Sequence, residues 1–341
     1  MSIKQGKQTY INDGKVYIKE TAAIVGPREK AGPLGEYFDE VQQEDYDEKT
    51  WEKAEAKFAN AAFQKLMRKI DKKSDDIDCI LAGDLMNQCI ASSLGLRDSG
   101  IPYLGLFGAC STIAEGMTTA SLLINSGGMN HVICMASSNF CSAEKTFRMP
   151  VEQGGQRPPT AQWTVTASGA LLISSEPGGP LITSVTIGKI TDYDITDSNN
   201  MGAAMAPAAA DTILAHLSDL GLDANYYDAI VTGDLGLTGS GILRELMDLH
   251  GCSLYRTEED RFIHQDCGAM IFDPVKQKTN SGGSGCGCGT AVFANYFYKQ
   301  LQYGILKRIL FVGTGALMSP ISVKQAESIS GIAHAVAIEA Q

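Results

Sequence analysis

Tyr103-Leu-Gly-Leu-Phe-Gly-Ala-Cys110-Ser111-Thr112 decides the fold of this chain, and an amphipathic pattern follows it up to Gly127 and Gly128. The short apolar run predicts a strand, and the spacing over 110–128 predicts a helix that ends on the glycine pair. This order places Cys110 at a helix N-terminus, where N–H groups and the helix dipole favour a thiolate or a bound anion. A free cysteine is equally often a small packing residue, so both interpretations stay open on the motif alone.

Strands and helices alternate on either side of this turn. Residues 77–84, 131–138 and 168–175 are short, apolar and rich in β-branched residues, so each is predicted to be a buried strand. An amphipathic helix is predicted over about 49–70. Strand, helix and strand of these lengths are typical of a parallel sheet in an α/β protein. The acidic stretch 36–55 is interpreted as a solvated loop and helix face.

The second half repeats the plan of the first. Residues 78–85 read Asp-Cys-Ile-Leu-Ala-Gly-Asp-Leu, and residues 228–235, 150 positions later, read Asp-Ala-Ile-Val-Thr-Gly-Asp-Leu. Strands over 309–316 and 332–339, with a helix over about 290–303, correspond to the later elements of the first half. We therefore expect two similar halves, 1–180 and 181–341, divided at a Pro-Gly-Gly-Pro turn. Two unrelated Rossmann-like domains are the alternative.

Composition excludes several classes of protein. The 341 residues are 44% hydrophobic, which is enough for a sizeable core and excludes disorder. The net charge of −11 argues against a nucleic-acid binder, whose affinity comes from neutralising phosphates. Nine cysteines without a zinc spacing are typical of a reducing compartment. With no signal-peptide pattern and no membrane-spanning apolar run, we expect cytoplasmic synthesis and no transmembrane helix.

Two motifs resemble the thiolase and β-ketoacyl synthase superfamily. Gly-Ala-Cys-Ser at 108–111 looks like the nucleophile turn, and TAQWTVTASGA at 160–170 looks like the strand that closes the first half. The resemblance implies an α/β fold of two similar halves related by a pseudo-twofold, layered α/β/α/β/α, with the pocket where the halves meet. It also implies a homodimer formed through the sheet of the first half.

A more particular resemblance is to the stage V sporulation protein AD family of spore-forming bacteria. It is carried by GDLMNQCIASSLGLRDSGIPYLGLFGACST at 83–112 and FIHQDCGAMIFDP at 262–274. The resemblance implies a non-catalytic protein that binds dipicolinic acid (pyridine-2,6-dicarboxylate), free or as its calcium chelate. It further implies a role in dipicolinate uptake into the developing spore, with membrane proteins of the same pathway, as a peripheral protein of the spore inner membrane.

Condensing activity is not expected, because the partners of the nucleophile look absent. Superfamily enzymes need a His or Asn from the second half to activate the thiol or stabilise developing charge. The resemblance places these positions on Gly282 and on Gly233 or Asp234, and places the second thiolase cysteine on Phe311. Cys286 and Cys288 are close enough in sequence to substitute, although a structural role is the simpler interpretation.

Two other functions stay open. One is an acyl-transferring condensing enzyme that uses Cys110 as the nucleophile and His264 as an unrecognised base. The other is a scaffold that binds no small molecule.

The candidate ligand site combines groups that suit a flat dicarboxylate. N–H groups at the start of the helix would donate to one carboxylate, and a glycine in place of His or Asn would leave room for a ring. Strand ends in α/β folds carry ligand-contacting residues, and polar neighbours would fix the tautomer of His264. Arg148 and Arg157 flank a loop that would reach the ligand, with surface solvation as the alternative. No cofactor or protein-bound metal is expected, and calcium enters only as part of the ligand. The candidate ligand-binding residues are Cys110, Ser111, His264, Asp84, Asp234 and Gly282.

Overall fold

The structure is a computed structural model that describes residues 3–147 and 156–341. Its principal strands are β1 Ile3–Gln5, β2 Thr9–Ile11, β3 Tyr17–Val25, β4 Glu40–Val41, β5 Cys79–Gly83, β6 Tyr103–Gly105, β7 His131–Ser138, β8 Trp163–Thr164, β9 Ala167–Ser174, β10 Leu181–Thr186, β11 Ala229–Thr232, β14 His264–Asp266, β15 Gly283–Ser284, β16 Arg308–Leu317 and β17 Ser330–Glu339. Its principal helices are α2 Trp51–Lys69, α3 Ile90–Leu96, α4 Thr112–Asn125, α5 Phe140–Phe147, α6 Met201–Leu220, α7 Gly236–Leu249, α8 Cys267–Ile271, α9 Cys286–Val292, α10 Tyr298–Gln302 and α11 Pro320–Lys324.

Two sets of five strands follow the same order. The first set runs β6-β5-β7-β9-β3 and the second runs β14-β11-β16-β17-β10. In each set the second strand is parallel to both of its neighbours, and the fourth is antiparallel to both of its own. The sets meet at a single β3–β10 pair, Tyr17 with Leu181. The repeat in the sequence is therefore a repeat in topology.

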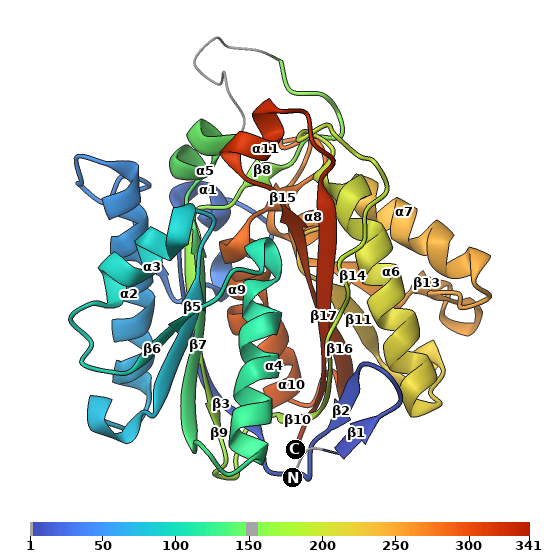
Figure 1. Cartoon of the computed structure of the whole chain (residues 1–341), viewed down its shortest axis with the longest axis horizontal. Coiled ribbons are helices and arrows are strands. Elements are labelled where there is room, and N and C mark those ends of the chain that lie inside the picture. Colours follow the sequence, from blue (N-terminus) through green and yellow to red (C-terminus); the bar gives the residue numbers. More distant parts are fainter. Residues whose placement is uncertain (1–2, 148–155) are drawn as a thin grey trace.

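Helices fill the space between the two sets of strands and cover their outer faces (Figure 1). Helix α4 contacts β5 and β7 of the first set and β16 and β17 of the second, and α9 packs beside it. Helices α2 and α3 cover the first set, while α6 and α7 cover the second. The arrangement is the expected α/β/α/β/α layering of a thiolase-like fold.

A matching aspartate fixes the same corner in each half. Asp78 accepts hydrogen bonds from the N–H groups of Asn130 (2.6 Å) and His131 (2.8 Å), where β7 begins. Asp228 does the same for Lys307 (2.6 Å) and Arg308 (2.9 Å), where β16 begins. The repeated Asp thus joins the starts of two parallel neighbouring strands.

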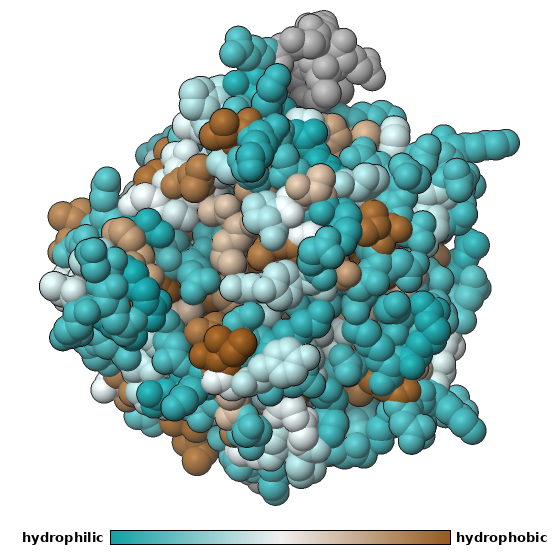
Figure 2. Space-filling model, turned by 180° about the vertical axis from the view of Figure 1, so that it is seen from behind, coloured by the Kyte–Doolittle hydropathy of each residue, from teal (hydrophilic) through white to brown (hydrophobic). Residues whose placement is uncertain are grey.

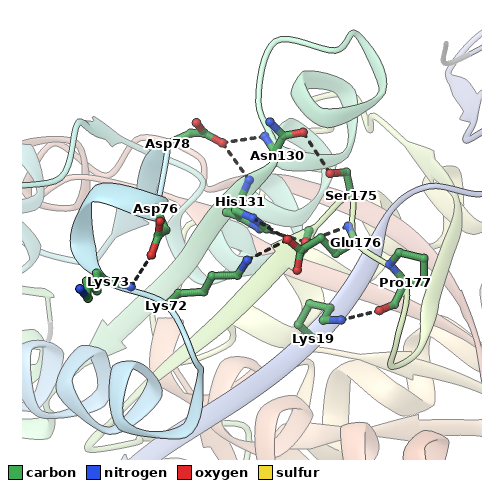
Figure 3. Close-up of polar contacts among 11 residues, drawn as sticks. Lys19, Lys72, Lys73, Asp76, Asp78, Asn130, His131, Ser175, Glu176 and Pro177 are labelled. Carbon is green, nitrogen blue, oxygen red and sulfur yellow. Dashed lines mark hydrogen bonds and ion pairs between the residues drawn. The ribbon is translucent and has the colours of Figure 1, made fainter.

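A histidine and a glutamate, His131 and Glu176, lie together at this same edge (Figure 3), and Ser174 is the second partner of the histidine. His131 lies 3.0 Å from Ser174 Oγ through Nδ1 and 3.3 Å from Glu176 through Nε2, and Lys72 bonds Glu176 at 2.8 Å. The set resembles a hydrolytic triad, but Ser174 is fully buried. Ser174 ends β9 and pairs with His131 at the start of β7, whereas Cys110 and Asp84 lie near the other end of the sheet. The network therefore ties the β9–β10 turn to the end of α2.

The face of the molecule seen in Figure 2 is mostly hydrophilic. On this face, hydrophobic residues are scattered rather than gathered into one large patch. Within 3–147 and 156–341, no helix is long and apolar enough to cross a membrane.

Sequence predictions for the elements agree with the structure except at their ends. The helix expected over 110–128 begins as a 3₁₀ turn at Ala109–Ser111 and continues as α4, which ends at Asn125. The acidic stretch 36–55 is not wholly solvated, because Glu55 is fully buried in α2. Its neighbours Ala54, Ala56 and Phe58 are also buried, so Glu55 lies on the core side of the helix.

Candidate functional site

A tight turn presents Cys110 between the two halves. Ala109 has a left-handed backbone (φ 49°), and the N–H of Ser111 donates to Gly108 O at 3.0 Å. Strand β16 passes so close that a Cβ on Gly315 would lie 2.4 Å from Gly108 O. Only a glycine fits there, so the second half holds the nucleophile turn of the first.

A cavity of about 450 Å³ opens beside Cys110. Its walls come from the end of β5, the Cys110 turn, α5, β8, β15 and the segment between β16 and α11. Its polar lining is made of hydroxyl and amide groups together with one carboxyl group. The lining residues are Asp84, Leu85, Met86, Asn87, Gln88, Phe107, Ala109, Cys110, Ala143, Phe147, Thr164, Met201, Ser284, Ala316, Leu317, Met318, Ser319 and Ser322.

The thiol of Cys110 has an acid and a second thiol as neighbours. It hydrogen-bonds to the Asp234 carboxyl group and to the Cys286 thiol. The hydrogen bond from Cys286 is the largest influence on the Cys110 pKa and lowers it. Burial and the negative charge of Asp234 together outweigh that effect, so the pKa of Cys110 is raised. The cysteine is therefore a protonated thiol at neutral pH.

Asp234 holds the glycine-rich loop of the second half in place. Its Oδ2 accepts from the N–H of Gly285 (2.9 Å) and the hydroxyl of Ser284 (3.2 Å), and its Oδ1 accepts from Thr314 Oγ1 (2.8 Å). Burial raises the pKa of Asp234 against these hydrogen bonds. The loop is also joined to the first half, because β15 pairs with β8.

Two buried acids are neighbours at the cavity, Asp84 in its wall and Glu55 behind it. Asp84 accepts from the N–H of Met86 (2.9 Å) and from the N–H and hydroxyl of Ser92 (2.8 and 2.7 Å). Glu55 accepts from Ser137 Oγ (3.1 Å) and Ser142 Oγ (2.6 Å). Burial first, and then the charge of Asp84, raises the pKa of Glu55 to about 8. At neutral pH this pair therefore retains a proton.

The cavity has an acidic character. Asp84 is its ionisable carboxyl group, and Asp234 lies just behind Cys110. No Lys, Arg or His is among the described residues that line it. A free dianion would be repelled there, whereas a neutral molecule or a metal chelate would not.

Sequence comparison assigns the chain to a family. The model of the family described as stage V sporulation protein AD matches residues 6–339. The chain belongs to the stage V sporulation protein AD family. A curated relative, stage V sporulation protein AD of Bacillus subtilis (strain 168), is 43% identical over 335 residues, which are 98% of this chain and 97% of the relative.

Solved structures show that this member of the stage V sporulation protein AD family has the thiolase-like fold. Cerulenin-bound OleA from Xanthomonas campestris is 14% identical with a TM-score of 0.59, over 98% of this chain and all of that one. The 3-oxoacyl-[acyl-carrier-protein] synthase III from Aquifex aeolicus VF5 is 10% identical with a TM-score of 0.54, over 99% of this chain and all of that one. At these identities the likeness concerns the fold alone.

The structure of this family member brings Cys110, Asp84 and Asp234 together, but not Ser111. The Ser111 hydroxyl donates to Gly108 O at 2.7 Å, and the residue is fully buried. Its N–H also donates to Gly108, as described above. The expectation that this N–H would donate to a ligand carboxylate is therefore corrected.

His264 lies in β14, away from the cavity lining. Its Nε2 is 2.8 Å from Thr232 Oγ1, and its Nδ1 accepts from Arg244 Nε at 3.3 Å. Burial, followed by the charge of Arg244, lowers the pKa of His264 to about 3. The residue is a neutral packing partner there, and neither the ligand contact nor the catalytic base follows from its position.

Gly282 and Phe311 also lie elsewhere than the sequence alignment suggested. The side-chain position of Gly282 faces Gly268, because a Cβ there would lie 2.5 Å from Gly268 O. This glycine therefore leaves no space beside Cys110. Phe311 is fully buried against Phe293, with ring centroids 4.8 Å apart.

Of the two arginines expected near the ligand, the structure describes Arg157 but not Arg148. Arg157 pairs with Glu144 at 2.7 Å and lies over the Trp163 ring, 4.8 Å from its centroid, so it packs behind Thr164 of the cavity wall. Arg148 lies outside the described residues.

Several site residues were missed from the sequence. No motif marks Glu55, Ser284 or Asp266. Asp266 accepts four hydrogen bonds, from Thr232, Leu235, Gly236 and Ala269. Asp266 follows a histidine and a glutamine in a short strand and precedes Cys267, a pattern that signals only an N-cap. The one signal that the sequence offers for Glu55 is the pair of alanines, Ala54 and Ala56, on either side of it.

Proposed function

We propose that this protein binds dipicolinic acid as its calcium chelate in the Cys110 cavity, without condensing acyl groups, and assists its uptake into the developing spore. Membership of the stage V sporulation protein AD family supports the sporulation role. The observation that carries the proposal is the cavity beside a protonated thiol, with Asp84 in its lining and Asp234, one of the two positions that the resemblance gives for a base, in contact with the thiol.

Asp234 disfavours acyl transfer. Condensing enzymes stabilise negative charge on a carbonyl oxygen with donors such as His and Asn. A carboxylate in contact with Cys110 has the opposite effect, because it repels both the thiolate and the developing oxyanion. The raised pKa of Cys110 agrees with this, since the thiol remains protonated.

The chelate fits the cavity better than the free dianion does. Calcium cancels the two negative charges of dipicolinate, so Asp84 no longer repels the ligand. The side-chain amides of Asn87 and Gln88 in the lining supply N–H donors for the carboxylate oxygens. Met201 and Phe107 supply apolar surface for the ring. The volume of about 450 Å³ falls within the range of small-molecule sites, roughly 300–1,000 Å³.

A calorimetric titration tests the proposal. The protein is titrated with dipicolinate in the presence and absence of calcium, and pyridine-2-carboxylate and isophthalate serve as near-isosteric controls. Saturable binding that requires both carboxylates and the ring nitrogen, and that strengthens at least tenfold with calcium, is expected. No heat in either condition would refute binding, and equal affinity with and without calcium would refute the choice of the chelate.

The thiol at the cavity wall favours a second candidate, acyl transfer by Cys110. Incubation with a medium-chain acyl-CoA followed by intact-protein mass spectrometry distinguishes the two. An acyl adduct that is absent in Cys110→Ala would favour the enzyme, whereas an unmodified chain supports the binding protein.

We also propose that the protein acts as a homodimer, at the spore inner membrane and with membrane proteins of the same pathway. Edge strand β6 supports the dimer, because Leu104 within it and Phe107 just after it are 51% and 66% exposed. Light scattering tests it. Leu104→Asp is expected to give monomers, whereas Leu249→Asp, at an 81% exposed site at the end of α7, leaves dimers. A monomeric unmodified protein would contradict the proposal.

A further inference from the structure

Two thiols from different halves are neighbours at the cavity, Cys110 in its wall and Cys286 behind it. The thiol of Cys286 neighbours that of Cys110 and donates to Ala109 O at 2.9 Å. Cys286 therefore lies against the peptide unit that precedes Cys110. Helix α9, which begins at Cys286, packs on the Cys110 turn and holds the two residues together.

The two thiols differ in their access to the cavity. Cys110 lines it and retains 6% exposure, whereas Cys286 is fully buried behind it. No other cysteine in 3–147 or 156–341 lines this cavity. A small reagent in the cavity would therefore reach Cys110 first and leave Cys286 as the second, resolving thiol.

We propose that Cys110 and Cys286 form a redox-active dithiol, which a peroxide converts into a disulfide across the two halves of the fold. The proposal concerns a modification site and does not depend on which ligand the cavity binds. It gives a role to the thiol that the binding function leaves unused.

The reaction balances with hydrogen peroxide as the oxidant. The sulfur of Cys110 attacks one peroxide oxygen, the O–O bond breaks, and the thiol proton goes to the departing hydroxide, which leaves as water. Cys110 is then a sulfenic acid. The sulfur of Cys286 attacks that sulfur, and its own proton leaves with the hydroxyl group as a second water. Two thiols are oxidised to one disulfide, and one peroxide is reduced to two waters.

Peptide mapping of the peroxide-treated, natively folded protein tests the proposal. A Cys110–Cys286 cross-linked peptide that has lost two hydrogens and is restored by dithiothreitol is expected. In Cys286→Ser the cross-link is lost, and Cys110 is trapped as its sulfenic acid by dimedone. Cys288→Ser is the matched control, because Cys288 is equally buried two residues further on, and it is expected to cross-link as the unmodified chain does.

A second measurement uses the unmodified chain and so does not depend on a variant that folds. Phenylarsine oxide binds two neighbouring thiols through one arsenic and releases one water, and Cys110 and Cys286 are expected to be protected together from later alkylation. The proposal is overturned if peroxide links other cysteines instead, if Cys110 remains a dimedone-reactive sulfenic acid in the unmodified chain, or if the arsenical protects neither thiol.

Discussion

Replacement of Glu55 by glutamine should change how stability depends on pH. Glu55 is buried in α2 beside Asp84, and its two partners are hydroxyl groups that can donate to a carboxylate or accept from an amide. Glutamine has the shape of the protonated glutamate and cannot ionise. We therefore expect Glu55→Gln to fold, and we expect its free energy of unfolding to differ least from that of the unmodified chain near pH 5.

The size of the effect follows from the pKa. Burial, with the charge of Asp84 as the second cause, raises the pKa of Glu55 from 4.5 to about 8. The folded state thus retains a proton that the unfolded state releases, so this contribution to stability is complete below about pH 4.5 and is lost as the pH rises towards 8. Each pH unit is worth about 1.4 kcal/mol, so the difference between the two chains changes by roughly 4 kcal/mol from pH 5 to pH 8.

Urea unfolding at a series of pH values measures this difference. The unmodified chain should lose stability relative to Glu55→Gln at each step from pH 5 to pH 8. The control is Glu48→Gln, because Lys57 lies 2.9 Å from that carboxylate and its hydrogen bond lowers the Glu48 pKa, which confines any change to acid pH. Parallel profiles for the unmodified chain and Glu55→Gln would refute the buried, protonated pair.

Three further predictions follow from single contacts. Gly315→Ala should lower the free energy of unfolding by about 1–3 kcal/mol in a urea titration, because its Cβ would meet Gly108 O at 2.4 Å; an unchanged midpoint would contradict this close approach. Asp78→Ala and Asp228→Ala should each cost about 1–3 kcal/mol, since each carboxylate accepts two N–H groups at a strand start; a large loss in one and none in the other would argue against equivalent corners. Thr50→Ala should lower the melting temperature through loss of the α2 N-cap, about 1 kcal/mol, whereas Thr50→Ser should retain most of it.

The architecture was predictable because its signals are local and repeated. Apolar β-branched runs and the pair 78–85 and 228–235 indicated the strands, and Asp78 and Asp228 prove to make equivalent bonds. Cys110 was predictable for the same reason, since a strand that runs directly into a helix leaves a recognisable turn.

The partners of Cys110 were harder to predict because they come from a glycine-rich loop. Within 281–285 three of five residues are glycine, so no side chain marks which position faces the thiol. The resemblance placed the partner of Cys110 at Gly282, whereas Gly285 and Cys286 are the residues that contact Cys110. Burial of an acid such as Glu55 depends on tertiary packing, which a charge pattern along the sequence does not contain.

A crystal structure of the protein grown with calcium and dipicolinate tests the central claim most directly. We expect the chelate in the cavity beside Cys110, between Asp84 and Ser284, with calcium retained on the ligand and no bond to sulfur. A second cavity of about 620 Å³ lies along α6 and is lined in part by Lys7 and Lys189. Ligand in that cavity, with none beside Cys110, would contradict the account.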